Sequence, residues 1–127
     1  MTAGMTAAPA ARMTPRRAQA LVWLAQRASA AVLALCVVVH LATMIIAVRE
    51  GLSAGEILAR TRGSVGWAAF YAVFVVAVAV HAPIGLRVVA GEWAGLRGRG
   101  VDVVLTVLGL ALLGLGARAV YAVTVAS

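Results

Sequence analysis

Three long apolar stretches separated by short polar connections dominate the chain. They cover about residues 28–48, 65–89 and 101–125, and each is long enough to cross a bilayer core, which takes about 20 helical residues. The connections, residues 49–63 and 91–100, hold glycines and charges of both signs. The pattern predicts an all-α integral membrane protein with three transmembrane helices.

The N-terminal segment, residues 1–20, differs from the remainder. It is rich in Ala, Thr and Pro and carries a basic cluster at Arg12, Arg16 and Arg17. We expect a mobile basic segment here, followed by a transmembrane domain over residues 21–127. The first apolar run is longer than the core of a secretory signal and contains a histidine, so we interpret it as a retained span.

The composition supports a membrane location. Hydrophobic residues make up 64% of the 127 residues, charged residues 12%, and the mean hydropathy is +1.03. There are too few polar side chains to coat a water-soluble globule. These values exclude a soluble enzyme, a disordered tail and a disulfide-stapled secreted module.

The basic residues, all arginines, lie mainly at the ends of the apolar stretches and give a net charge of +7. Anionic lipid and the insertion machinery account for arginines in such places, so we expect no nucleic-acid partner. An N-terminus on the cytoplasmic side places seven arginines inside and four outside. This asymmetry predicts an N-in orientation, which we expect in a bacterial cytoplasmic membrane.

The chain has two histidines, His40 and His81, and each lies within an apolar stretch. An ionisable group in a span costs roughly 2.5–3.5 kcal/mol on insertion scales, so it is a functional hypothesis by default. Imidazole is the usual axial ligand that a membrane protein offers to haem iron. The alternative is that each histidine only forms hydrogen bonds between helices.

The surroundings of His81 suit a porphyrin. Ala77 and Gly85 lie one helical turn on either side of it, and Gly85 leaves room for a macrocycle or a second helix. Arg87 lies about 9 Å further along the helix axis, within reach of a haem propionate. Pro83 removes one backbone hydrogen bond and should bend the helix near the histidine.

The two histidines are predicted to lie at different depths. His40 is about 20 Å from the boundary marked by Arg27, whereas His81 is about 9 Å from Arg87. Two axial ligands of one iron must lie at the same depth. Any haem at either histidine would therefore need its second ligand from another chain.

Two segments resemble a known family. The segment from His81 to Arg87, with Gly85 inside it and Glu92 after it, resembles the second-helix motif of the cytochrome b membrane-anchor subunit of succinate dehydrogenase. Residues 26–30, which include Arg27 and Ser29, resemble the start of the first helix in that family. Trp23, Gln26 and Ala30 depart from the family's common residues.

The resemblance implies a role for each matching residue. His81 would be an axial ligand of haem b, and Arg27 and Ser29 would lie near a ubiquinone or menaquinone pocket. Arg27 or Arg87 would reach a haem propionate. His40 resembles the ligand of a second, distal haem in the di-haem anchors of the family, so one haem or two are implied.

The implied function is that of a haem b-binding membrane anchor of a succinate:quinone or quinol:fumarate oxidoreductase. The chain would form part of a multi-subunit helical bundle with a second anchor subunit, an iron–sulfur subunit and a flavoprotein. Electrons would pass to quinone, and the dicarboxylate chemistry would reside in the flavoprotein, so no residue here is predicted to be catalytic. The alternatives are a haem-free structural anchor and a cytochrome b subunit of a different quinone-linked dehydrogenase.

Overall fold

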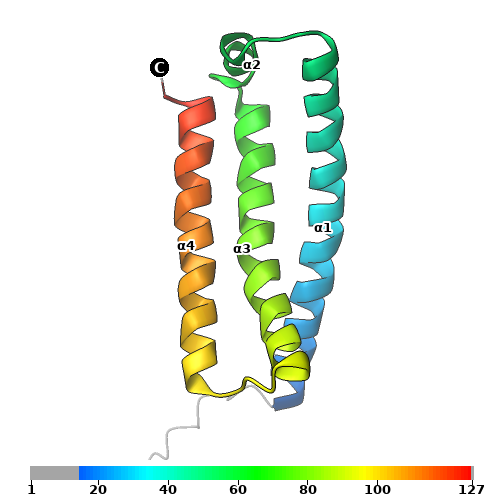
Figure 1. Ribbon diagram of the computed structural model, residues 1–127, viewed down its shortest axis with the longest axis vertical. Helices are drawn as coiled ribbons and strands as arrows, with labels where there is room; N and C mark the ends of the chain where they lie inside the picture. Colours follow the sequence, from blue (N-terminus) through cyan, green and yellow to red (C-terminus); the bar gives the residue numbers. More distant parts are fainter. Residues whose placement is uncertain (1–14, 127) are drawn as a thin grey trace, which may run out of the picture.

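The structure, a computed structural model, describes residues 15–126 and is built from four α-helices (Figure 1). The long helices are α1 (Pro15–Arg49), α3 (Val65–Trp93) and α4 (Arg99–Thr124), and α2 (Ala54–Thr61) is short. No strand occurs in the described range. The three long helices are each long and apolar enough to cross a membrane, which confirms the predicted all-α fold and an integral membrane protein.

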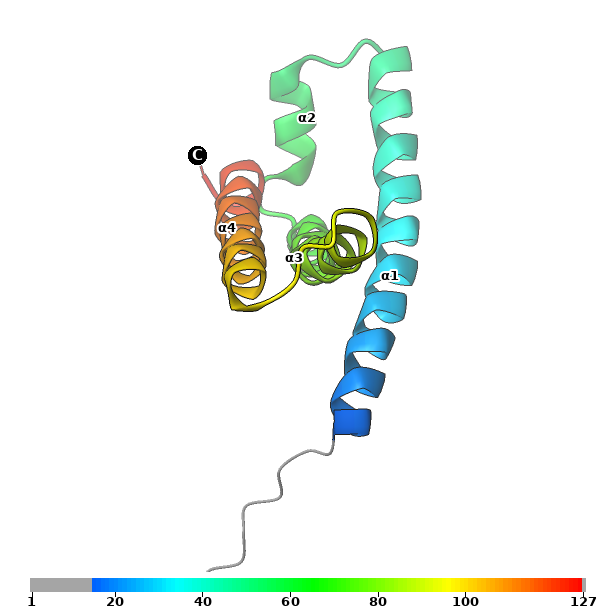
Figure 2. The same cartoon turned by 60° about the horizontal axis from the view of Figure 1, so that its bottom comes forward.

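Helix α3 occupies the middle of the molecule. It packs against both α1 and α4, whereas α1 and α4 barely contact each other (Figure 2). The long helices therefore form a layer one helix thick, and few side chains are shielded on every side. The buried residues of the described range are Ser29, Cys36, Ala47, Thr61, Ala77 and Thr124. Lipid or partner subunits must cover the two broad apolar faces of this layer.

A regular seam joins α1 to α3. Buried or half-buried residues recur along one side of α1, among them Ser29, Cys36, His40, Thr43 and Ala47. Their spacings of seven, four, three and four residues are made of the three- and four-residue steps that keep side chains on one side of a helix. Ser29 and His40 contact side chains of α3. The seam brings polar side chains of α1 against the histidine-bearing face of α3.

Helix α1 begins earlier than the sequence pattern suggests. The predicted span starts at residue 28 and a mobile segment was expected through residue 20, but residues 15–20 form the first turns of α1. Residues 1–14, with Arg12, lie outside the described range. Pro15 is suited to the first helical position, and no Gly or Pro follows it before Arg49 to interrupt the helix.

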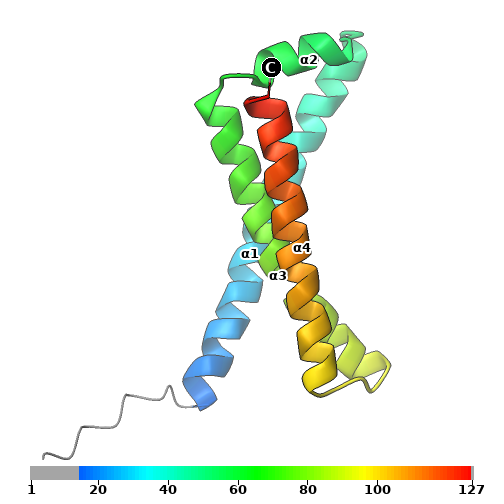
Figure 3. The ribbon, with the colours of Figure 1, turned by 90° about the vertical axis from the view of Figure 1, so that its left-hand side faces the viewer.

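Helix α2 lies in the connection predicted as a loop at residues 49–63, and it crosses the end of the bundle (Figure 3). Its N-terminus is a capping box: the Ser53 hydroxyl accepts from the Glu56 N–H at 3.3 Å, and the Glu56 carboxylate accepts from the Ser53 N–H at 2.7 Å. Its C-terminus docks on α4, because the Thr61 hydroxyl donates to the Val123 carbonyl at 2.7 Å.

Helix α3 bends in its second half, where Pro83 lies inside it (Figure 1). Helix α4 approaches the bend through Gly109, where a Cβ atom would lie 3.0 Å from Pro83 Cγ and 3.2 Å from the Ala79 carbonyl oxygen. Further along α4, a Cβ at Gly116 would overlap the Val75 side chain. The bend predicted from Pro83 is confirmed, and small residues of α4 allow the helices to pack closely along it.

The two ends of the bundle are built differently. The α2 end is closed by α2 and by the last turn of α4. The opposite end, called here the 94–98 end, contains the first turns of α1 and the short α3–α4 connection, which turns through Gly95 (φ 64°) and Gly98 (φ 113°). At the 94–98 end α1 diverges from α3 and α4, as Figure 3 shows.

Candidate functional site: the His81 contact and the adjoining cleft

His81 lies on the half-buried face of α3 that meets α1. Its Nδ1 atom is 3.3 Å from the hydroxyl oxygen of Ser29 on α1. The same hydroxyl donates to the backbone carbonyl of Gln26, one turn earlier, at 3.1 Å. The α1–α3 seam therefore joins two residues that the sequence analysis had assigned to different roles.

The second ring nitrogen of His81, Nε2, has no hydrogen-bond partner among residues 15–126. It is also not fully buried, so it can be reached from outside the described chain. An imidazole held by one nitrogen and open at the other is what an axial ligand requires. The described residues contain no group of three or more His, Cys, Asp or Glu side chains that could hold a metal ion. The His81 imidazole thus has the geometry of a single axial ligand.

Gly85, expected to give room beside His81, lies under a side chain of α1. A Cβ atom at this position would be 3.1 Å from Nε2 of Gln26. In this chain Gly85 therefore serves the approach of a second helix, one of its two expected uses. The side-chain oxygen of Gln26, Oε1, is buried and has no hydrogen-bond partner among the described residues. From the sequence, Gln26 stood out only as a departure from the family pattern.

Arg87 forms an ion pair that the sequence analysis did not anticipate. Its Nη2 atom is 3.1 Å from Oδ1 of Asp102 on α4, and the two side chains are 64% and 40% exposed. An ion pair this exposed is weak, so Arg87 remains able to meet another anionic group. The sequence did carry a signal for this pair: Arg87 and Asp102 have opposite charges and lie near the facing ends of two helices joined by a short connection.

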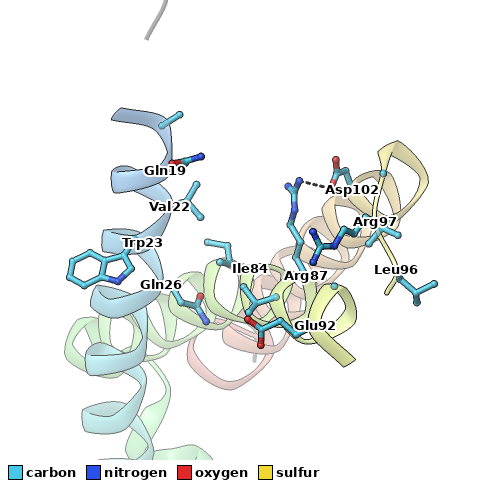
Figure 4. A pocket seen from close by; sticks show the side chains of 15 residues that line it. Gln19, Val22, Trp23, Gln26, Ile84, Arg87, Glu92, Leu96, Arg97 and Asp102 are labelled. Atoms are coloured by element: carbon cyan, nitrogen blue, oxygen red, sulfur yellow. Dashed lines mark ion pairs between the residues drawn. The ribbon is translucent and has the colours of Figure 1, made fainter. Parts of the chain in front are cut away.

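A cleft of about 720 Å³ opens at the 94–98 end between α1 and the adjoining ends of α3 and α4. In Figure 4, Gln19, Val22 and Gln26 of α1 face Arg87, Arg97 and Asp102 across it. Its other charged lining residue is Glu92. The cleft is thus lined by apolar side chains and by two arginines and two carboxylates, whose charges cancel.

Arg27 and Ser29, predicted together near a quinone, lie on different faces of α1. The Arg27 guanidinium is exposed and stacks 5.2 Å from the centroid of the Trp23 ring. Ser29 is only 7% exposed and faces His81. Trp23 lines the cleft, whereas neither Arg27 nor Ser29 does. The structure therefore brings Ser29 to His81 and leaves Arg27 on the outer surface of α1.

His40 lies toward the α2 end, in aromatic surroundings. The rings of Tyr71 and Phe74 on α3 meet it edge-on, each with a centroid distance of 6.0 Å. Its Nδ1 atom is buried without a hydrogen-bond partner. The ring lines a pocket of about 350 Å³ whose other walls are mainly aliphatic residues of α2 and α4.

The two histidines lie in separate places. His40 follows Ser29, the partner of His81, by 11 residues, which corresponds to about 16 Å along α1. Each histidine also has its own partners on the facing helix. The geometry agrees with the expectation that they do not share one iron.

The fold and site define a class of protein: a membrane-spanning helical protein with an intramembrane imidazole open at one nitrogen and with broad exposed apolar faces. The family model of the succinate dehydrogenase/fumarate reductase transmembrane subunit matches residues 5–124, and the chain belongs to this family. No curated protein and no solved structure matches the chain. The family match confirms the resemblance drawn from residues 26–30 and from the His81 segment, and identifies a membrane subunit of that complex.

Proposed function

We propose that this chain is a haem b-binding anchor of a succinate:quinone or quinol:fumarate oxidoreductase and takes part in electron transfer from an iron–sulfur subunit to quinone. The family supplies the complex to which the chain belongs. The observation that carries the haem proposal is the His81 imidazole, engaged at Nδ1 and without a partner at Nε2. No other described side chain on this part of α3 is a haem-iron ligand of the usual kinds.

His81 would hold the haem iron, with the second ligand supplied by a second anchor subunit. When bound, the haem supplies an iron that takes up and releases single electrons. Arg87 would meet a propionate, since its pairing with Asp102 is exposed and weak. The bend at Pro83 and the Gln26–Gly85 contact would keep α1 and α3 together beside the ligand.

The quinone would enter at the 94–98 end. The cleft there offers apolar side chains, the side-chain NH₂ of Gln26 and the guanidinium groups of Arg87 and Arg97. Donors of this kind stabilise the negative charge that develops on a quinone oxygen during reduction. Arg27 is exposed on the neighbouring face of α1 and does not line the cleft. It would contact the quinone from the side of α1 that faces away from the cleft, or in an interface with a partner subunit. The Ser29 hydroxyl donates its hydrogen to the Gln26 backbone carbonyl, so Ser29 could contact a quinone only as a hydrogen-bond acceptor.

A second haem at His40 is the second candidate. It is favoured by the buried Nδ1 atom of His40, which lacks a hydrogen-bond partner among residues 15–126, and by the pocket at the α2 end that His40 lines. Leaving such a group unsatisfied costs about 1–3 kcal/mol, a cost that a bound group or a partner chain would remove.

The partners would be a second anchor subunit on an uncovered face of the helical layer, together with the iron–sulfur and flavoprotein subunits. With the N-terminus in the bacterial cytoplasm, the 94–98 end would face these peripheral subunits, which places the cleft beside the incoming electrons. The arginine asymmetry along the chain supports this orientation.

The test is the haem-to-flavin ratio of the purified complex, measured by pyridine haemochrome. We expect at least one haem b per flavin, and a complex without haem would leave only a structural anchor. Identifying the co-purifying soluble subunits separates this proposal from a cytochrome b of another quinone-linked dehydrogenase.

The quinone role has its own test in Arg27→Ala. We expect lower quinone reductase activity with dye-linked dehydrogenase activity retained, because the dye bypasses the membrane subunit. An equal loss of both activities would contradict a quinone role for Arg27.

A further inference from the structure

Ser29 makes two hydrogen bonds that compete for one proton. Its hydroxyl oxygen lies 3.1 Å from the Gln26 backbone carbonyl and 3.3 Å from Nδ1 of His81. A carbonyl can only accept, so the first bond uses the single hydroxyl hydrogen of Ser29. The oxygen then takes part in the second bond only as an acceptor.

Both bonds can therefore form together only when the imidazole donates to the Ser29 oxygen through Nδ1. In that neutral tautomer Nε2 is the bare nitrogen with a lone pair. This is the nitrogen for which no described residue provides a hydrogen bond. Ser29 is 7% exposed, so water has little access to replace its oxygen in this bond.

We propose that Ser29 is a positioning residue that selects the tautomer and ring orientation of His81 and so presents bare Nε2 to an electron-poor centre. In the haem-binding anchor proposed above, on which this inference rests, that centre is the haem iron. A hydrogen bond from the remaining N–H of a ligating imidazole fixes the ring and raises its basicity. The inference moves Ser29 from the quinone pocket to the support of the ligand.

Thr43 provides a matched control on the same helix and the same seam. It lies fourteen residues after Ser29, and its hydroxyl donates to the His40 backbone carbonyl three residues earlier at 2.7 Å. This is the same local bond that Ser29 makes with Gln26. The structure gives Thr43 no hydrogen bond to a ring nitrogen, so its loss should leave His81 unchanged.

The experiment compares Ser29→Ala with Thr43→Val in the purified complex. In Ser29→Ala we expect haem to remain ligated but to be bound about 10–100 times less tightly, the range typical for removing the hydrogen-bond partner of a metal-ligating histidine. The low-spin ferric haem signal should shift in the electron paramagnetic resonance spectrum, and the midpoint potential should become more positive because the imidazole is less electron-donating. Thr43→Val should reproduce the wild type.

Unchanged haem retention, spectrum and potential in Ser29→Ala would overturn the inference while leaving the haem proposal intact. An equal change in both variants would also overturn it, since the effect would then belong to helix packing. If the wild-type complex contains no haem, the proposed function fails and the inference is decided by ¹⁵N nuclear magnetic resonance of the full chain labelled in histidine. Protonated Nδ1 on His81 supports it, and unprotonated Nδ1 overturns it.

Discussion

The two ends of the bundle place their histidines in opposite kinds of surroundings. At the 94–98 end, His81 has a hydroxyl partner on α1 and lies next to a segment that opens into a cleft rimmed by charges. At the α2 end, His40 is packed against Tyr71 and Phe74, and its Nδ1 atom has no partner. The chain completes the polar contact of one histidine and not of the other.

The difference follows from how the chain closes on itself. Helix α2 and the residues that follow it bond to the last turn of α4 and close the α2 end: Thr61 donates to the Val123 carbonyl at 2.7 Å and the Gly63 N–H to the Thr124 carbonyl at 2.8 Å. Among residues 15–126, no comparable element covers the 94–98 end, where α1 diverges.

The largest expected effect comes from exchanging the two histidines separately for glutamine. His81→Gln should abolish the haem associated with this histidine, because glutamine does not ligate haem iron in its place. The readout is the haem-to-flavin ratio of the purified complex. His40→Gln is the matched comparison and should retain that haem, losing at most one further equivalent if the second candidate site is occupied. Equal haem in His81→Gln and wild type would exclude His81 as the ligand.

Packing along the α3–α4 contact provides the next effect. Gly116→Ala introduces a Cβ that overlaps the Val75 side chain and should cost about 1–3 kcal/mol in stability. Gly114→Ala is the control, because nothing lies within 4 Å of its Cβ position, and it should gain about 0.5–1 kcal/mol from helix propensity. Thermal unfolding of the complex in detergent measures both. Identical midpoints would show that α3 and α4 are not this close.

A smaller effect is expected at the charged rim of the cleft. Asp102→Asn removes the partner of Arg87, and this exposed ion pair should be worth less than about 1 kcal/mol. The same unfolding measurement at low and high salt should show a small loss that disappears as salt rises. A loss as large as that of Gly116→Ala would mean that the pair is shielded in the assembled complex.

The smallest effect is local and depends on pH. Hydrogen bonds from the Ser53 backbone N–H and hydroxyl, with a smaller contribution from Arg60, hold the pKa of Glu56 below its ordinary value of 4.5. Because the folded-state pKa is lowered, the stabilisation of α2 is present above pH 4.5 and is lost as the pH falls through the lowered pKa.

Hydrogen exchange of the α2 amides tests this dependence. Wild type should be better protected than Glu56→Gln at pH 7, and the difference should vanish at a pH below the lowered pKa. A difference that persists in acid would assign the protection to the docking of Thr61 on α4 instead.

Much of the fold was predictable from local pattern. The lengths of the apolar stretches located the three spanning helices, and Pro83 located the bend, because both depend on neighbouring residues along one helix. The start of α1 at Pro15 and the presence of α2 were missed. Both are polar segments whose helicity depends on capping and docking rather than on apolar periodicity.

The candidate site was predictable only in part. His81 could be singled out because an ionisable group in an apolar span is costly, and Arg87 because of its spacing from it. Gln26 over Gly85 and Asp102 beside Arg87 could not, since each contact depends on how two helices are rotated about their axes. Whether His40 is a ligand stays a prediction.

The amino-acid sequence by itself determined that this protein resides in a membrane, that it crosses it three times and that an imidazole lies within the second span. These properties depend on the length of the apolar stretches and on the position of an ionisable residue within one of them, and both can be seen in the linear sequence. Only the tertiary structure decided which nitrogen of His81 is engaged, because Ser29 lies 52 residues away along the chain and meets the ring through the packing of α1 on α3. It also decided which end the chain closes for itself, since Thr61 and Val123 meet across 62 residues.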